Sequence, residues 1–279
     1  MIKLKHGNSK LILQPWRGGS ISHWNINNRE ILYCDQKSYQ EKNIKYKGGI
    51  PVMFPIFSTT CLNGDNKIRY DGKQIDLQQH GFARLSNLWR CNQVADNQIN
   101  MYLQANTETL ASFPFKFEFE QQLTIIENTL NITQKVFNPS KETLPFVSGI
   151  HPYFSISDPS NCEINGIPYG SPYYLQLNSG ERDFNAKLNQ SLPLGKSEIN
   201  HHFKSSPSKV TLKDRKTGHQ ITLEKSPEYP CITVWSELNQ PFICIEPNTG
   251  RRGAFETREN LIRLKPGESW SGKIKITAS

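Results

Sequence analysis

The chain has 279 residues and a net charge of +8, with 36% hydrophobic and 21% charged residues. Together with 17 prolines and 18 glycines, this composition excludes a disordered chain and is typical of a folded, loop-rich protein. No apolar run approaches the roughly 20 residues that span a bilayer, and the first residues lack a signal-peptide core, so we expect a cytoplasmic protein without a membrane partner.

The basic residues are scattered along the chain, and the densest pair is Arg251-Arg252. No basic helix or tract of the kind that follows a phosphate backbone is present, which argues against nucleic acid and leaves a phosphorylated small molecule possible. The six cysteines are widely spaced without a Cys-x-x-Cys pair. We therefore expect reduced thiols, with neither a zinc site nor a disulfide framework.

The first third of the chain predicts short strands and one buried loop. Residues 11–33 contain apolar runs separated by turns, which indicates two or three short strands. Residues 47–57 hold paired glycines and two prolines, which exclude a helix and favour a buried loop near a site. Asp71-Gly72 between two apolar flanks is the signal of a two-residue hairpin.

The rest of the chain continues the β pattern. Between residues 99 and 137 apolar and polar residues alternate, which predicts antiparallel strands with one face on a core. Residues 155–207 predict long ordered loops with short strands, rich in aromatic residues that include Tyr173 and Phe184. Further strands are expected in the following segments: 210–212, 221–223, 231–235, 242–245 and 270–276. We expect one all-β domain over residues 1–279, a large two-sheet antiparallel sandwich.

One histidine stands out in the segment Phe146-Val147-Ser148-Gly149-Ile150-His151-Pro152-Tyr153-Phe154. Proline restricts the preceding residue to extended backbone, so His151 is expected at the end of a strand. A histidine beside aromatic rings is often a hydrogen-bonded core residue, and taken alone this segment does not distinguish that role from a catalytic one.

A second segment, Phe242-Ile243-Cys244-Ile245-Glu246-Pro247, is again an apolar strand whose last residue is ionisable and precedes a proline. Alternation places Phe242, Cys244 and Glu246 on one face. A carboxylate at this position is desolvated, which raises its pKa and suits it to act as a general base, whereas a solvent-facing strand end is the alternative.

An imidazole and a carboxylate that face a sugar-sized pocket suit reversible proton transfer at a hemiacetal. Glu246 would take the proton of the anomeric hydroxyl while His151 protonates the ring oxygen, and no metal or organic cofactor is needed. The same two residues also suit other acid/base reactions, so on their own they do not determine the chemistry. His80 and Arg84, in the segment Gln79-His80-Gly81-Phe82-Ala83-Arg84, are candidate donors to substrate oxygens. Further candidates for an anion contact are Lys47, Arg17 and Arg251.

Four segments together resemble the galactose mutarotase-like superfamily, over about residues 10–277. They are Gly48-Gly49-Ile50-Pro51-x-x-Phe54-Pro55, the segment from Gln79 to Arg84, His151-Pro152-Tyr153-Phe154 and Cys244-Ile245-Glu246-Pro247. They look most like the branch of aldose 1-epimerases and glucose-6-phosphate 1-epimerases. The resemblance implies a β-supersandwich and a cytoplasmic, cofactor-free enzyme that interconverts α and β anomers.

By position, the resemblance implies that His151 is the general acid, Glu246 the general base, His80 a second histidine that orients the sugar, and Arg84 a substrate contact. Two positions depart from the family pattern. Lys47 stands where the hexose-6-phosphate branch usually has a phosphate-binding arginine, and lacks its bidentate fork. Asn200 is the nearest match to an aspartate that holds sugar hydroxyls, and an amide can still bind hydroxyls.

The leading hypothesis is therefore an aldose 1-epimerase that acts on a hexose or hexose phosphate. The departures at Lys47 and Asn200 motivate an alternative, a non-catalytic carbohydrate-binding or regulatory sandwich of the same fold. The net charge of +8 motivates a weaker third hypothesis, a nucleic-acid-binding β-protein, against which the absence of a basic tract argues. The sequence does not name the sugar or the oligomeric state.

Overall fold

The structure is a computed structural model that describes residues 1–41, 46–177 and 180–279, without the side chains of residues 176–186. Within these residues the antiparallel strands form two eight-stranded sheets, one four-stranded sheet and two two-stranded sheets. The predicted all-β architecture is confirmed. No helix in the described ranges combines the length and the apolar character that crossing a membrane requires.

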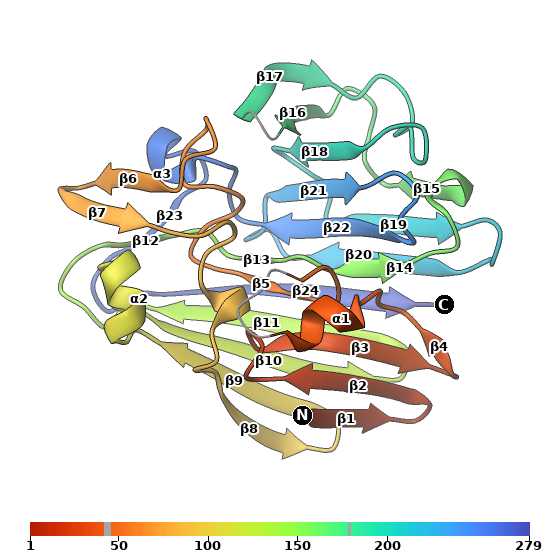
Figure 1. Ribbon diagram of the computed structural model, residues 1–279, viewed down its shortest axis with the longest axis horizontal. Coiled ribbons are helices and arrows are strands. Elements are labelled where there is room, and N and C mark those ends of the chain that lie inside the picture. The colour runs from red at the N-terminus through yellow and green to blue at the C-terminus, as the bar shows by residue number, and fades with distance from the viewer. Residues whose placement is uncertain (42–45, 178–179) are drawn as a thin grey trace.

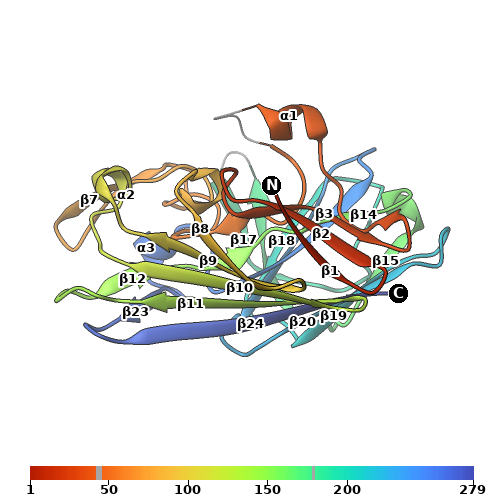
Figure 2. The same ribbon diagram turned by 90° about the horizontal axis from the view of Figure 1, so that it is seen from below.

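The first large sheet carries the alternating segments of the sequence. Its strands, in spatial order, are β15 (Cys162–Asn165), β19 (Lys209–Asp214), β20 (Gln220–Lys225), β24 (Ser269–Ala278), β11 (Thr129–Phe137), β10 (Glu118–Ile126), β9 (Gln98–Gln104) and β8 (Arg90–Ala95). Along β10 and β11 every second residue is buried, as the period of two predicts. Figure 2 shows this sheet as one layer of the molecule, with β1–β3 on one side of it.

The second large sheet carries the candidate site residues. Its strands, in spatial order, are β17 (Gly180–Lys187), β16 (Pro172–Leu177), β18 (Ile199–Phe203), β21 (Cys231–Ser236), β22 (Phe242–Asn248), β13 (Gly149–Ile150) and β5 (Val52–Met53), and β14 (Tyr153–Ser155) also pairs with β22. Ile232 and Val234 of β21 and Ile243 and Ile245 of β22 belong to the main core. The residues between them therefore face away from that core.

The remaining elements surround these sheets (Figure 1). The small sheets consist of β1 (Ile2–His6), β2 (Ser9–Gln14), β3 (Ser20–Ile26) and β4 (Arg29–Glu30); β6 (Lys67–Tyr70) and β7 (Lys73–Asp76); and β12 (Leu144–Phe146) and β23 (Ile262–Leu264). The helical elements are α1 (Gln36–Gln40), α2 (Thr107–Ser112) and α3 (Ala254–Thr257), with 3-10 turns η1 (Ala83–Leu85) and η2 (Pro159–Asn161).

Most predicted segments are found where the sequence placed them. Asp71 and Gly72 both have positive φ, as a two-residue hairpin turn between β6 and β7 requires. Residues 47–57 are mostly buried loop, with the two residues of β5 as their only regular strand in the described part. Residues 155–207 hold more strand than expected, and the side chain of Phe184 lies outside the described residues.

The predicted end of one strand is wrong. Strand β22 does not stop at Glu246 but continues through Pro247 to Asn248. On its β13 and β14 side the ladder passes from the pair Gly149/Asn248 to the pair Tyr153/Cys244. Pro247 thus lies beside an interruption of the ladder, where a residue without an N–H group is tolerated. Glu246 is consequently an interior residue of a central strand.

Candidate active site

The six residues singled out in the sequence line one cavity of about 370 Å³. They are Lys47, His80, Arg84, His151, Asn200 and Glu246. A cavity of this size is in the range that binds small molecules. The structure therefore brings together residues that are up to 199 positions apart in the chain, from Lys47 to Glu246.

Two rows of side chains cross the second sheet on the face that carries the cavity, and most of their members line it. Ladder partners in an antiparallel sheet point to the same face. One row joins Asn200, Trp235, Cys244 and Tyr153 across β18, β21, β22 and β14. The second row, two residues further along, joins His202, Thr233 and Glu246. The predicted shared face of Phe242, Cys244 and Glu246 is confirmed, because Phe242 and Cys244 pack with Tyr153 outside the main core.

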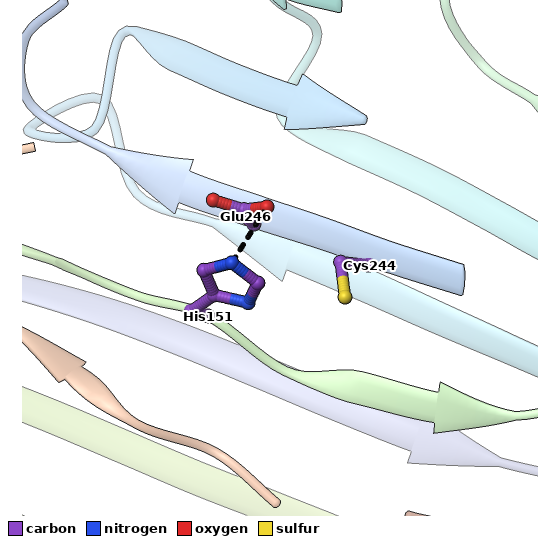
Figure 3. A group of neighbouring side chains, drawn as sticks. All are labelled: His151, Cys244 and Glu246. Atoms are coloured by element: carbon purple, nitrogen blue, oxygen red, sulfur yellow. Dashed lines mark ion pairs between the residues drawn. The ribbon is translucent and has the colours of Figure 1, made fainter. Parts of the chain in front are cut away.

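His151 and Glu246 contact each other directly. His151 follows β13, as predicted, and its Nε2 lies 3.3 Å from Oε1 of Glu246 (Figure 3). Both side chains are buried. At this distance one proton can pass between the two atoms, carried either by the carboxyl group or by the imidazole. The two side chains therefore lie side by side in the cavity lining.

Burial controls the charge of this pair. It raises the pKa of Glu246 well above its ordinary value, although the positive charge of Arg84 acts in the opposite direction. It also lowers the pKa of His151 to about 3, and the charge of Arg84 lowers it further. Both shifts favour the arrangement in which a neutral carboxyl group donates its proton to a neutral imidazole.

The environment of His151 is aromatic. The ring of Tyr153 stacks on the imidazole with centroids 4.7 Å apart, and Trp235 and His80 approach edge-on at 5.6 and 5.3 Å. These rings hold the imidazole in one orientation. Among the described residues, Nδ1 of His151 is buried and has no hydrogen-bond partner.

Arg84 lies in η1 and is buried, with its Nη2 donating to the carbonyl oxygen of Tyr46 at 3.3 Å. The guanidinium also lies over the Tyr46 ring, 5.7 Å from its centroid. Its influence on the pKa values of both His151 and Glu246 shows that its charge is close to the pair. Arg84 is thus placed to favour the ionised form of Glu246 over that of His151.

Three exposed or half-buried charged residues form the mouth of the cavity: Lys47, Glu198 and Glu237. Lys47 Nζ donates to both carboxylate oxygens of Glu237 at 2.9 and 2.7 Å. Its side chain is 49% exposed. The expected anion contact of Lys47 is therefore already made with a carboxylate of the chain.

Of the arginines considered as anion contacts, Arg251 and Arg17 lie outside the cavity, whereas Arg252, which was not selected from the sequence, lines it. Arg251 forms an ion pair with Glu259 at 2.6 Å and stacks on Tyr174, and it does not line the cavity. Arg17 is also buried elsewhere, over the ring of Tyr46. Arg252 lines the cavity instead, with Nε donating to Ser58 Oγ at 3.0 Å. The alternation that orients β22 ends at Asn248, so the sequence does not show which neighbouring arginine faces inward.

Cys244 is the third possible metal ligand near the pair. Its Sγ, a ring nitrogen of His151 and a carboxylate oxygen of Glu246 lie within 4.8 Å of one another (Figure 3). Burial raises the pKa of Cys244 well above its ordinary value, so the thiol is neutral beside the pair. Since His151 and Glu246 already share a proton, we interpret this group as a proton-transfer pair beside a neutral thiol.

Comparison with known proteins gives consistent matches over the whole chain. The profile of the aldose 1-epimerase family matches residues 1–277. A Cenchrus ciliaris protein provisionally named glucose-6-phosphate 1-epimerase is 26% identical over 313 aligned residues, which cover 100% of this chain and 87% of that protein. The uncharacterized protein YphB of Escherichia coli (strain K12) is 24% identical, over 98% of this chain and 97% of that protein.

Solved structures include similar folds. The structure of Slr1438 from Synechocystis sp. PCC 6803 matches with a TM-score of 0.89 and 28% identity, over 100% of this chain and 95% of that one. A galactose mutarotase-like protein from Lactobacillus casei ATCC 334 matches with a TM-score of 0.81 at 21% identity, over 100% of both chains. These matches confirm the predicted galactose mutarotase-like fold.

Proposed function

The chain belongs to the aldose 1-epimerase family, and on that premise we propose that it catalyses the interconversion of α and β anomers of a hexose or hexose 6-phosphate. The single observation that carries the proposal is the buried contact of 3.3 Å between His151 Nε2 and Glu246 Oε1 in the lining of a ligand-sized cavity. The relative from Cenchrus ciliaris supports a hexose 6-phosphate as one candidate substrate.

The side-by-side arrangement of the pair suits the geometry of a hemiacetal. The ring oxygen and the anomeric hydroxyl oxygen are bonded to the same carbon, so two groups that lie side by side can exchange protons with both of them. Glu246 takes the proton of the anomeric hydroxyl, His151 gives a proton to the ring oxygen, and the bond between that oxygen and the anomeric carbon breaks. The open aldehyde rotates about its bond to the next carbon and closes on its other face by the reverse transfers.

The total number of protons on the pair is the same before and after ring opening. The reaction begins with a carboxylate and an imidazolium and ends with a carboxyl group and a neutral imidazole. The unliganded pair favours the second arrangement because of its burial. A bound sugar supports the first one, because its hydroxyl donates to Glu246 while its ring oxygen accepts from His151. One proton moved across the 3.3 Å contact connects the two arrangements.

The test is the rate at which freshly dissolved α-anomers of hexoses and hexose 6-phosphates equilibrate, followed by polarimetry or NMR. We expect Glu246→Gln and His151→Asn to lower kcat by about 10²- to 10⁴-fold, the usual contribution of a general acid or base. Glu224→Gln and His219→Asn are matched controls outside the cavity and should keep the wild-type rate.

Wild-type rates in both cavity variants would contradict the assignment. Binding of sugars without any acceleration by the wild-type protein would instead favour the non-catalytic carbohydrate-binding alternative. Equal acceleration of hexose and hexose 6-phosphate would show that the mouth of the cavity does not select for phosphate.

A further inference from the structure

Two hydrogen bonds join His80 and Ser58, one between their backbones and one from the Ser58 backbone to the His80 ring. The N–H of His80 donates to the carbonyl oxygen of Ser58 at 2.7 Å, and the N–H of Ser58 donates to Nδ1 of the His80 ring at 3.1 Å. Both residues are buried and line the cavity. We call this pair of hydrogen bonds the Ser58–His80 clasp.

The clasp determines which nitrogen of His80 carries the proton. An N–H group donates only to a ring nitrogen without a proton, so Nδ1 must be the unprotonated nitrogen. The neutral ring then carries its proton on Nε2 and acts there as a hydrogen-bond donor. A donor at this position suits the oxygen-rich surface of a sugar, which is the role that the proposed function needs from His80.

The clasp also requires unusual backbone conformations. Ser58 has φ of 55° and His80 has φ of 65°, in the left-handed region that residues with side chains rarely adopt. Such conformations persist only where surrounding contacts hold them, and they are frequent at functional sites. The next residue contributes to the same close packing, because a Cβ on Gly81 would lie 2.2 Å from the carbonyl oxygen of Phe54.

Arg252 supplies a contact that holds Ser58. Its Nε donates to Ser58 Oγ at 3.0 Å, although the two residues are 194 positions apart in the sequence. The guanidinium is buried and also lines the cavity. A continuous chain of hydrogen bonds therefore leads from Arg252 through Ser58 to the imidazole of His80, whose ring in turn meets that of His151 edge-on at 5.3 Å.

We propose that Ser58 and Arg252 are positioning residues that hold the His80 imidazole in its Nε2–H form at the cavity wall. The inference deepens the proposed function, because it assigns the residues that prepare His80 to donate to the sugar. Loss of the Ser58 hydroxyl or of the Arg252 guanidinium should change the protonation and orientation of the His80 ring while the protein stays folded.

The test is a long-range ¹H–¹⁵N spectrum of the histidine rings of the full-length protein, with the His80 signals assigned by their loss in His80→Asn. We expect wild-type His80 to show one unprotonated Nδ1 and one protonated Nε2. In Ser58→Gly and Arg252→Gln this pattern should become an average of both tautomers. Ser58→Gly is informative because glycine tolerates the positive φ and keeps the N–H donor while removing the hydroxyl.

Arg251→Gln is the matched control, because Arg251 is the adjacent buried arginine but belongs to the ion pair with Glu259. Its His80 signals should be those of the wild type. In the anomerisation assay, Ser58→Gly and Arg252→Gln should each lower kcat/KM about 5- to 50-fold. The double variant should lose little more than either single one, since both act through one chain of contacts.

A wild-type proton on Nδ1, or unchanged His80 signals in both variants, would overturn the proposal. The spectrum reports on the clasp even if the protein does not accelerate anomerisation, so the failure of the proposed function and the failure of this inference are distinguishable.

Discussion

At the scale of single residues, the shared proton of His151 and Glu246 determines how the site should respond to pH. The pair works while it holds one proton in total, in either arrangement. It gains a second proton only when His151 is protonated in addition, and burial lowers that pKa to about 3. It loses its single proton only above the raised pKa of Glu246. The pair should therefore stay active over a wider pH range than a glutamate and a histidine with ordinary pKa values would.

We accordingly expect kcat/KM for anomerisation to remain within about 2-fold between pH 5 and pH 7, after subtraction of the spontaneous rate. An ordinary histidine acid would lose activity through its pKa of about 6.5 as the pH rises. The measurement is a pH–rate profile with the wild type and with Glu224→Gln as the control. An inflection near pH 6.5 in both proteins would contradict a pair that shares one proton.

At the scale of elements, the position of His151 depends on the close approach of β13 to β22. Gly149 pairs with Asn248, and a Cβ on Gly149 would lie 2.6 Å from the carbonyl oxygen of Pro247 and 2.8 Å from Cβ of Asn248. Only glycine fits at this distance. Gly149 thus allows β13 and β22 to pack closely enough for the imidazole of His151 to contact the carboxylate of Glu246.

Gly149→Ala should therefore separate the two strands. We expect the free energy of unfolding to fall by about 1–3 kcal/mol, the usual cost of overpacking, and kcat of the folded protein to fall about 10-fold or more. In the control Gly218→Ala the new Cβ meets no atom within 4 Å but the φ of 75° is strained. That variant should lose about 1 kcal/mol of stability and none of its activity per folded molecule.

Urea unfolding and the anomerisation rate, measured on the same samples, check this prediction. Full activity in Gly149→Ala would show that the contact between His151 and Glu246 tolerates a displaced β13.

Local patterns in the sequence predicted the elements that depend on near neighbours. The hairpin at Asp71-Gly72 and the alternating strands β10 and β11 follow from turn chemistry and from a period of two. The extended backbone at His151 follows from the next proline. The rows across the second sheet were not predictable, because the register of β18 against β21 depends on contacts between segments more than 30 residues apart, such as His202 with Thr233. Arg252 was missed because the alternation along β22 ends at Asn248, before the two neighbouring arginines.

At the scale of the whole molecule, three buried or partly buried histidines should make stability depend on pH. Burial lowers the pKa of His201 to about 4 and of His202 to about 3, and His151 behaves similarly. The neighbours that face His202 include the hydroxyl of Thr233 and the charges of Arg251 and Lys204, and both cations oppose its protonation. These groups titrate freely only in the unfolded chain.

The sign of the effect follows from the number of bound protons. Below the ordinary pKa of about 6.5 the unfolded chain takes up protons on these histidines that the folded protein excludes. Stability therefore decreases as the pH falls from 6.5 toward 4. Glu30 and Glu246 contribute with the opposite sign, since burial raises both pKa values and their share of the stability is lost as the pH rises above about 4.5.

His202→Asn isolates one of the histidine contributions. Between pH 6.5 and 4.5 the free energy of unfolding should fall more steeply with decreasing pH in the wild type than in the variant. The two slopes should differ by up to about 1.4 kcal/mol per pH unit, because the variant takes up one proton fewer than the wild type on unfolding. Above pH 6.5 the two curves should run parallel, separated by the constant cost of the lost contact with Thr233. Urea titrations at half-unit pH intervals measure both regions. Equal slopes below pH 6.5 would contradict the prediction, because His202 would then bind its proton equally well in the folded and the unfolded protein.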